Sequence, residues 1–374
     1  MKKIKRNILL NPGPATTTDA VKRAMVVPDI CPREKEFGMI IRQIQKDLTK
    51  IVNGGKEHIS VLFAGSGTAT MDAVINSVVP PRRKIAIVIN GAYGQRMMKI
   101  AQVYKIPYVE IDFGTGGKVD LKKVNRILKK DKKIDCLAVV HHETTTGILN
   151  PIKQIGELSK RYGCTYIVDA ISSYAGIPID IKKCKIDFLM STSNKCIQGM
   201  AGAAFLICNK KSLEKIRNYP PRSFYLNLYQ QYKFFKETGQ TPFTPPVQVI
   251  YALKEAIKEY FREGGKNRYK RYTENWKTLR KGMLDLGFKL LHEEKDESHL
   301  LFTILDPDSR NFSFEMLHDL LYKRGFTIYP GKIGKSKTFR LANIGAINKK
   351  DIQNFLKALS QVLKSMNVNL LRHD

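Results

Sequence analysis

Lys195 stands in a stretch whose residue types suit covalent chemistry with a carbonyl group. A short apolar run, residues 188–190, is typical of a buried strand, and Gly199 and Gly202 then free the backbone for tight turns. A lysine just past a core strand lies where α/β folds place their ligands. Such a lysine can form a Schiff base with an aldehyde. A solvated surface lysine is the alternative interpretation, and for a lone lysine in so basic a chain it would be preferred.

A carboxylate, Asp169, ends a second apolar run, residues 165–169. A buried acid must find a cation or several hydrogen-bond donors. A third run, residues 136–140, leads into His141-His-Glu-Thr-Thr-Thr-Gly147, whose Thr144 supplies a hydroxyl group. The two histidines suggest a metal site, but adjacent residues on an extended chain point in opposite directions, and no further ligand cluster completes such a site. We therefore expect no metal.

A strand, a glycine-rich turn and a helix follow one another over residues 59–78. The turn contains Ser66, Gly67 and Thr68. Free N–H groups and the dipole at a helix N-terminus attract a dianion, and the two hydroxyl groups can add hydrogen bonds. A plain strand-to-helix turn with Thr68 as the cap is the alternative. The motif matches neither the P-loop nor the dinucleotide fingerprint, which argues against a nucleotide ligand.

Three further side chains are candidates for ligand contacts. Tyr93 follows the strand expected at residues 85–90, where its ring could stack on a flat cofactor, although ordinary packing is the alternative. Arg340 lies inside a short, otherwise apolar run, residues 338–341, and a buried arginine needs an anionic partner. We favour a carboxylate or phosphonate ligand over an internal salt bridge. For Arg33, an exposed charge is favoured over an anion ligand.

Strands and helices alternate over residues 59–208, which predicts a largely parallel sheet with helices on both faces. The carboxyl ends of parallel strands meet at one edge of such a sheet. We expect five side chains to converge there: Ser66, Tyr93, Thr144, Asp169 and Lys195. The chain should divide into an N-terminal extended segment (residues 1–15), a large domain (16–255) and a smaller C-terminal α+β domain (256–374).

Composition narrows the classes of function. The net charge is +30, but the lysines are scattered and no nucleic-acid-binding motif occurs, so we expect a surface that steers anionic substrates and no nucleic-acid partner. The six cysteines show no paired spacing, which is typical of reduced thiols in a cytoplasmic protein. No apolar run reaches membrane-spanning length, and the run after the basic N-terminus is cut short by Pro12.

Taken together, these motifs resemble those of a known family. The spacing of 26 residues from Asp169 to Lys195, the Gly-Ser-Gly-Thr68 turn and the segment Thr244-Pro-Pro246 are similar to those of class V aminotransferases, which are fold type I enzymes that use pyridoxal 5′-phosphate. The resemblance implies an α/β fold with a mostly parallel, seven-stranded sheet in the large domain and a smaller α+β C-terminal domain.

Three motifs make the resemblance narrower. Residues 10–14, 142–151 and 193–199 look most like those of members that transfer the amino group of 2-aminoethylphosphonate to pyruvate in a ping-pong reaction. Alanine– or serine–glyoxylate aminotransferases are the alternative, because Arg340 would serve their carboxylates equally well. Those enzymes usually place tryptophan over the ring, and the only tryptophan here is Trp276. Cysteine desulfurases need a cysteine in the C-terminal part, and none follows Cys208.

The resemblance also implies a role for each cofactor contact. Lys195 would hold pyridoxal phosphate as a Schiff base and then act as the base that moves a proton, and Asp169 would pair with the pyridine nitrogen. Tyr93 would stack on the ring, and Thr144 or Thr145 would bond near its phenolic oxygen. The phosphate would be held by Ser66, Gly67 and Thr68.

The remaining implied roles concern the substrate and a partner chain. Arg340 matches the family's ligand for the substrate anion, and Gly13 and Arg33 are further candidate substrate contacts. Thr244 is similar to a residue that reaches the phosphate from the neighbouring subunit, so a homodimer with shared active sites is implied. A basic nucleic-acid-binding protein with a dead aminotransferase fold is the alternative from another class, and it predicts loss of Lys195 or Asp169, both of which are present.

Overall fold

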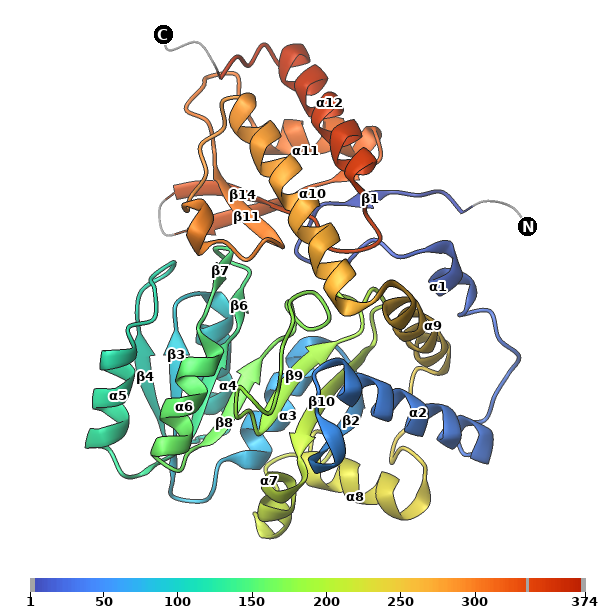
Figure 1. Ribbon diagram of the computed structural model, residues 1–374, viewed down its shortest axis with the longest axis vertical. Coiled ribbons are helices and arrows are strands. Elements are labelled where there is room, and N and C mark those ends of the chain that lie inside the picture. The colour runs from blue at the N-terminus through green and yellow to red at the C-terminus, as the bar shows by residue number, and fades with distance from the viewer. Residues whose placement is uncertain (1–3, 334–335, 371–374) are drawn as a thin grey trace.

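The computed structural model describes residues 4–333 and 336–370, which form a large lower part and a smaller upper part (Figure 1). A seven-stranded sheet forms the centre of the lower part. Its strands lie in the order β2 (His58–Ala64), β10 (Ala203–Asn209), β9 (Phe188–Thr192), β8 (Thr165–Asp169), β5 (Ile134–Val140), β3 (Lys84–Ile89) and β4 (Tyr108–Asp112). Strand β10 is antiparallel to both neighbours, whereas the other pairings are parallel. The predicted α/β fold with a mostly parallel sheet is confirmed.

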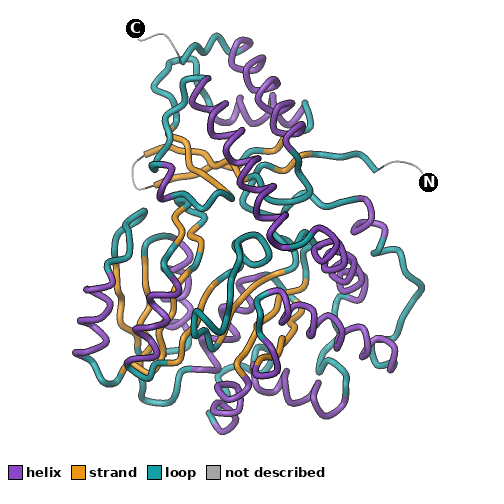
Figure 2. Tube along the Cα trace, in the orientation of Figure 1, coloured by secondary structure: helices purple, strands orange, loops and turns teal. Residues whose placement is uncertain are grey.

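Helices cover both faces of this sheet (Figure 2). Alternate residues of β3 show why: Ala86 and Val88 belong to one apolar core, whereas Ile85 and Ile87 belong to the other. One core includes residues of α2 (Lys35–Ile51), α5 (Leu121–Lys130), α6 (Ile152–Arg161) and α9 (Val247–Glu263). The opposite core includes residues of α3 (Gly67–Val78), α4 (Ala92–Val103), α7 (Lys210–Lys215) and α8 (Leu228–Thr238).

The upper part is built on an antiparallel sheet in the order β11 (Leu301–Leu305), β14 (Ser336–Ala342) and β13 (Tyr329–Ile333). Helices α10 (Gly265–Asp285), α11 (Phe314–Lys323) and α12 (Lys349–Ser365) pack with it around Trp276 and Phe339. The N-terminal segment belongs to this part, because β1 (Ile8–Leu9) pairs with β12 (Phe326–Thr327) and Leu10 is buried in the same core.

The chain passes between the two parts at Gly264, which has a φ of +81° and separates α9 from α10. The domain boundary expected between residues 255 and 256 falls inside α9. The division into segments 1–15, 16–255 and 256–374 therefore stays a proposal. A hairpin, β6 (His142–Glu143) and β7 (Ile148–Leu149), rises from the lower part towards the upper one (Figure 1). The shorter helical elements are α1 (Asp19–Arg23) and 3-10 turns at Gly55–Glu57, Ile216–Asn218 and Glu294–Asp296.

Within the described part of the chain, no helix is both long and apolar enough to cross a membrane. All six cysteines are free thiols, and each of them except the exposed Cys31 is buried.

Candidate active site

The carboxyl ends of the parallel strands meet at a hollow beneath the upper part. Four of the five side chains expected at this edge line it: Tyr93 after β3, Thr144 after β5, Asp169 at the end of β8 and Lys195 after β9. Ser66, the fifth, precedes Gly67, and a Cβ added at Gly67 would lie 2.9 Å from the side chain of Ile171, which also lines the hollow. The turn at Ser66 is therefore adjacent to the hollow.

Lys195 is held in the hollow by the N-terminal segment. Its Nζ donates a hydrogen bond of 2.5 Å to the carbonyl oxygen of Pro12. Burial, with a smaller contribution from the charges of Arg340 and Arg96, lowers the pKa of the Lys195 amine to about 8. A Cβ added at Gly13 would lie 2.3 Å from this Nζ, so only glycine fits beside the lysine. A larger fraction of this amine is therefore neutral near physiological pH than in a solvated lysine, and the neutral amine is the nucleophile.

Asp169 is almost fully buried at the end of β8. Its Oδ1 accepts a hydrogen bond of 2.8 Å from the backbone N–H of Ile171, and no arginine or lysine of the described chain forms an ion pair with it. Burial raises the pKa of its carboxyl to about 7. A buried acid in this state suits a cationic group of a bound molecule, such as a protonated ring nitrogen.

A buried glutamate, Glu143, organises the loop that follows β5. It accepts hydrogen bonds from the backbone N–H groups of Tyr93 (3.2 Å) and Thr145 (3.1 Å), and from Oγ1 of Thr145 (2.6 Å). The hydroxyl group of Thr145 is therefore engaged within the chain. The buried Oγ1 of Thr144, in contrast, has no hydrogen-bond partner among the described residues. Of the two threonines, Thr144 is the one with a hydroxyl group open to a ligand.

The turn after β2 differs from the simple cap considered above. Helix α3 begins at Gly67, so Ser66 occupies the N-cap position and Thr68 lies inside the first turn; the interpretation of Thr68 as the cap is wrong. The Ser66 hydroxyl makes no capping hydrogen bond, whereas Oγ1 of Thr68 accepts one of 3.1 Å from Nη1 of Arg96. The guanidinium of Arg96 also lies 4.7 Å from the ring centre of Tyr93. The turn thus combines a helix N-terminus with a cation, which favours a dianion.

Arg340, on β14, contacts the loop that lines the hollow. Its Nη1 and Nη2 donate 3.0 Å hydrogen bonds to the carbonyl oxygens of Thr144 and Pro330, and its buried Nε has no partner in the described chain. Burial lowers the pKa of this guanidinium. No ion pair involving Arg340 occurs among the described residues, so the internal salt bridge considered as an alternative is not found.

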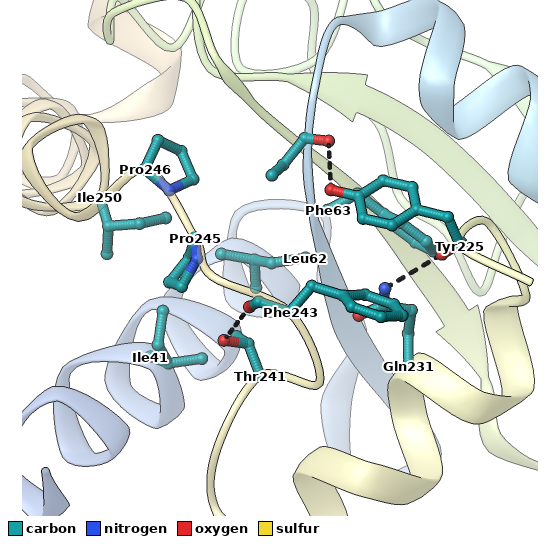
Figure 3. Close-up of a pocket in the computed structure, with 11 residues that line it drawn as sticks. Ile41, Leu62, Phe63, Tyr225, Gln231, Thr241, Phe243, Pro245, Pro246 and Ile250 are labelled. Carbon is teal, nitrogen blue, oxygen red and sulfur yellow. Dashed lines mark hydrogen bonds between the residues drawn. The ribbon is translucent and has the colours of Figure 1, made fainter. Parts of the chain in front are cut away.

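Arg33 and Thr244 do not line the Lys195 hollow of their own chain. Both belong to a separate surface region around residues 240–246, where Arg33 donates to the carbonyl oxygens of Thr241 and Pro242. Figure 3 shows this segment covering an apolar pocket, with Tyr225 bonded through its hydroxyl to the carbonyl oxygen of Ala64 at 3.4 Å. The Thr244 side chain is exposed.

Several residues of the site carried no clear signal in the sequence. His142 lines the hollow, although its motif suggested only a metal, and Ser172 lines it beside Asp169. Arg96 and Glu143 are recognisable as functional only once β3 and β5 lie side by side. Among the residues that the structure describes, no group of histidine, cysteine, aspartate and glutamate side chains could hold a metal ion.

Comparison with known proteins assigns the family. The model of the family described as Aminotransferase class-V matches residues 22–328. The chain belongs to the class V aminotransferase family. It is also 41% identical over 357 residues (95% of this chain and 97% of the relative) to a protein of Bacillus cereus strain AH187 named 2-aminoethylphosphonate–pyruvate transaminase. A protein of Salmonella heidelberg with the same name is 39% identical over 94% of this chain and 96% of its own.

Solved structures agree with this assignment. An alanine–glyoxylate aminotransferase from Nostoc sp. superposes with a TM-score of 0.89, at 26% identity over 97% of this chain and 96% of its own. A pyridoxamine–pyruvate aminotransferase from Mesorhizobium loti has the same fold, with a TM-score of 0.87 at 22% identity over 97% of this chain and 93% of its own. Class V aminotransferases depend on pyridoxal phosphate, and this chain is an enzyme of that family.

Proposed function

We propose that this class V aminotransferase transfers the amino group of 2-aminoethylphosphonate to pyruvate, giving phosphonoacetaldehyde and alanine. The observation that carries the proposal is the similarity, over nearly the whole chain, to relatives that bear the name of this transaminase. The residues of the hollow support it, because a buried lysine with a lowered pKa lies near a buried acid and an arginine without an anionic partner among the described residues.

The residues of the hollow fit pyridoxal 5′-phosphate. Asp169 lacks a cationic partner in the described chain, and Oγ1 of Thr144 and Nε of Arg340 are buried polar atoms without partners. Such atoms are costly unless a ligand satisfies them. Asp169 would hold the pyridine nitrogen, Thr144 the side of the phenolic oxygen, and Tyr93 the face of the ring. The phosphate would take the turn of Ser66, Gly67 and Thr68.

When bound, pyridoxal phosphate withdraws electrons from the bonds of the substrate carbon and stores the amino group between the two half-reactions. The chain's own residues control the protons. Lys195 has a pKa of about 8, so it can give up a proton and take one back near neutral pH, moving it between the substrate carbon and C4′ of the cofactor. The Asp169 carboxylate would keep the ring nitrogen protonated. Pro12 offers a carbonyl oxygen that orients the free amine.

Arg340 is proposed to bind the anionic end of each substrate in turn. The phosphonate of the donor and the carboxylate of pyruvate both present oxygen pairs that a guanidinium can bind with two hydrogen bonds. Nη1 already donates to the carbonyl oxygen of Thr144, so Arg340 and the proposed cofactor contact are fixed relative to each other. Gly13, whose lack of a side chain lets Lys195 pack against the backbone, would lie beside the substrate amine.

A homodimer with shared active sites is part of the proposal. Thr244 is exposed and would reach the cofactor phosphate of the partner subunit. Arg33 holds the same segment through a hydrogen bond of 3.3 Å to the carbonyl oxygen of Pro242. Phe224 is 87% exposed beside this segment, and its ring contacts that of Phe243 in a tilted arrangement with 5.7 Å between ring centres. Light scattering on the cofactor-loaded protein should give a mass twice that of one chain. The substitution Phe224→Asp should lower the measured mass towards that of a single chain.

The experiment that tests the proposed substrates measures the steady-state rate with two pairs of amino donor and keto acceptor, and identifies the products of each. We expect alanine and phosphonoacetaldehyde from 2-aminoethylphosphonate and pyruvate, with little turnover of alanine or serine with glyoxylate. The Nostoc enzyme of similar fold is named for alanine and glyoxylate, so turnover of that pair alone would replace the proposal with the glyoxylate reaction.

A further inference from the structure

His142 is a buried side chain at the hollow that the proposed function leaves without a role. It is 2% exposed and lines the hollow together with Thr144, Asp169 and Lys195. Its Nδ1 has no hydrogen-bond partner among the described residues. Leaving a buried polar nitrogen unpaired is costly, so the atom indicates a partner that a bound molecule supplies.

The other ring nitrogen connects His142 to the upper part of the molecule. Nε2 lies 2.8 Å from Oγ of Ser298, which precedes β11. The segment around Ser298 is docked on the hairpin that carries the active-site loop: the N–H of Ser298 donates to the carbonyl oxygen of Gly147 at 3.1 Å, and Glu297 forms an antiparallel bridge with Ile148. Ser298 therefore has a fixed place against the imidazole.

The hydrogen bonds of Ser298 determine where the imidazole carries its proton. Burial lowers the pKa of His142 to about 3, so the ring is neutral and only one nitrogen bears hydrogen. Oγ of Ser298 accepts a hydrogen bond of 3.2 Å from the N–H of Leu300. Within the described chain, the acceptor next to the Ser298 hydroxyl hydrogen is Nε2 of His142. The hydroxyl therefore donates to Nε2, and the ring hydrogen is on Nδ1.

We propose that His142 is a cofactor contact that donates its Nδ1–H to the phenolic oxygen of bound pyridoxal phosphate, and that Ser298 is the positioning residue that fixes this hydrogen. The inference rests on the proposed cofactor. The Ser66 turn after β2 and the loop after β5 lie on opposite sides of β9 and β8 in the sheet. With the phosphate at that turn, Asp169 at the ring nitrogen and Lys195 at the aldehyde carbon, the phenolic oxygen would lie on the side of the loop that carries His142 and Thr144. A donor there stabilises the negative charge of that oxygen.

The test uses the pH at which the visible absorption band of the cofactor-loaded protein changes. His142→Gln removes a donor at the Nδ1 position, and Ser298→Ala removes the group that keeps the hydrogen there. A donated hydrogen bond favours the negative oxygen, so its loss should raise the midpoint by about one pH unit in both variants. The double variant should have nearly the same midpoint as either single variant, because both substitutions act on one hydrogen bond. The charged side chains around the ring are the same in all variants: Lys195, Asp169, Glu143, Arg340 and Arg96.

Matched variants separate this role from packing. His142→Asn keeps a donor near Nδ1, and Ser298→Thr keeps the hydroxyl, so both should have the wild-type midpoint. Ser159→Ala is the control, since Ser159 is a buried serine near the C-terminal end of α6 that does not line the hollow, and its hydroxyl donates a 2.8 Å hydrogen bond to the carbonyl oxygen of Cys164. An unchanged midpoint in His142→Gln, or equal shifts in Ser298→Ala and Ser159→Ala, would overturn the inference.

Failure of the inference and failure of the proposed function give different results. If the wild-type protein shows no visible band with pyridoxal phosphate, the proposed cofactor is wrong. If the band is present and its midpoint is the same in all variants, only the role of His142 and Ser298 is wrong. Should His142→Gln not fold, Ser298→Ala still tests the claim, because Ser298 does not line the hollow.

Discussion

Nζ of Lys195 donates a 2.5 Å hydrogen bond to the carbonyl oxygen of Pro12, a residue 183 positions earlier in the chain. Pro12 follows β1, which pairs with β12 in the upper part of the molecule. The lysine on the central sheet is thus covered by a segment that belongs to the small C-terminal core. The active site is complete only when both parts are assembled.

Gly13 should be intolerant of any side chain. A Cβ at this position would lie 2.3 Å from Nζ of Lys195, and the residue has a φ of +135°. We expect Gly13→Ala to weaken cofactor binding at least tenfold, measured by absorbance titration. Gly163→Ala is the control for backbone strain alone, because Gly163 has a φ of +68° but nothing within 4 Å of the added Cβ. Equal behaviour of the two variants would contradict the steric account.

The lowered pKa of Lys195 should appear in the rate of cofactor capture by the cofactor-free protein. Only the neutral amine attacks an aldehyde, so the rate should rise with pH and level off above a midpoint of about 8. Stopped-flow absorbance measures this rate, and a blocked lysine amide in solution corrects for the cofactor's own titration. A midpoint near the ordinary lysine value of 10.5 would show that Lys195 is solvated.

Asp169→Asn should stabilise the cofactor-free protein at high pH while lowering its aminotransferase activity. In the cofactor-free protein, burial raises the pKa of Asp169 to about 7 from 3.8, so the stability that its proton contributes is present below pH 4 and lost as the pH rises to 7. The uncharged amide avoids this loss. Relative to wild type, the variant should therefore gain roughly 2–4 kcal/mol of unfolding free energy between pH 4 and pH 8, measured with urea.

The same variant should lose most of its amino transfer, because a neutral amide cannot hold a protonated ring nitrogen. We expect a fall in kcat of about a hundredfold or more, with the fold unchanged by circular dichroism. A stability difference that is the same at both pH values would contradict the assignment of Asp169 as a buried acid without a cation.

Arg340→Lys should impair both half-reactions while sparing the cofactor. Lysine keeps the charge but loses the paired hydrogen bonds, each worth about 1.5–3 kcal/mol to a charged oxygen. We expect kcat/KM to fall about a hundredfold for the amino donor and for pyruvate alike, and cofactor affinity to stay within about threefold of wild type. An effect on one substrate only would mean that the other anion is bound elsewhere.

The strands of the large sheet were predictable because their apolar runs are distinct: residues 165–169 are a strand with the expected limits, and the run at residues 136–140 lies within β5. The orientation of β10 was not foreseen. Only ten residues join β9 to β10, too few for a helical crossover to a parallel strand, and this spacing could have indicated an antiparallel pair. The pairing of β1 with β12 depends on contacts between the two ends of the chain, which local patterns do not contain.

In the site, too, the features set by local sequence could be predicted, and those set by contacts between distant residues could not. Asp169 and Lys195 could be located because the first ends a strand of the sheet and the second follows its neighbour. The choice between Thr144 and Thr145 could not be made, because it depends on Glu143 accepting a hydrogen bond from Thr145. His142 was missed since its partner, Ser298, is 156 residues away. Thr244 remains a prediction that concerns a second chain.

The most direct test of the account is a single half-reaction on the purified protein loaded with pyridoxal phosphate. With no keto acid present, 2-aminoethylphosphonate should convert the visible band of the lysine-bound cofactor to the absorption of pyridoxamine phosphate, and pyruvate should then restore it. Lys195→Ala should show neither change. Conversion by alanine or serine but not by the phosphonate, with recovery on glyoxylate, would contradict the proposed substrates, and a band that persists in Lys195→Ala would contradict the role of the lysine.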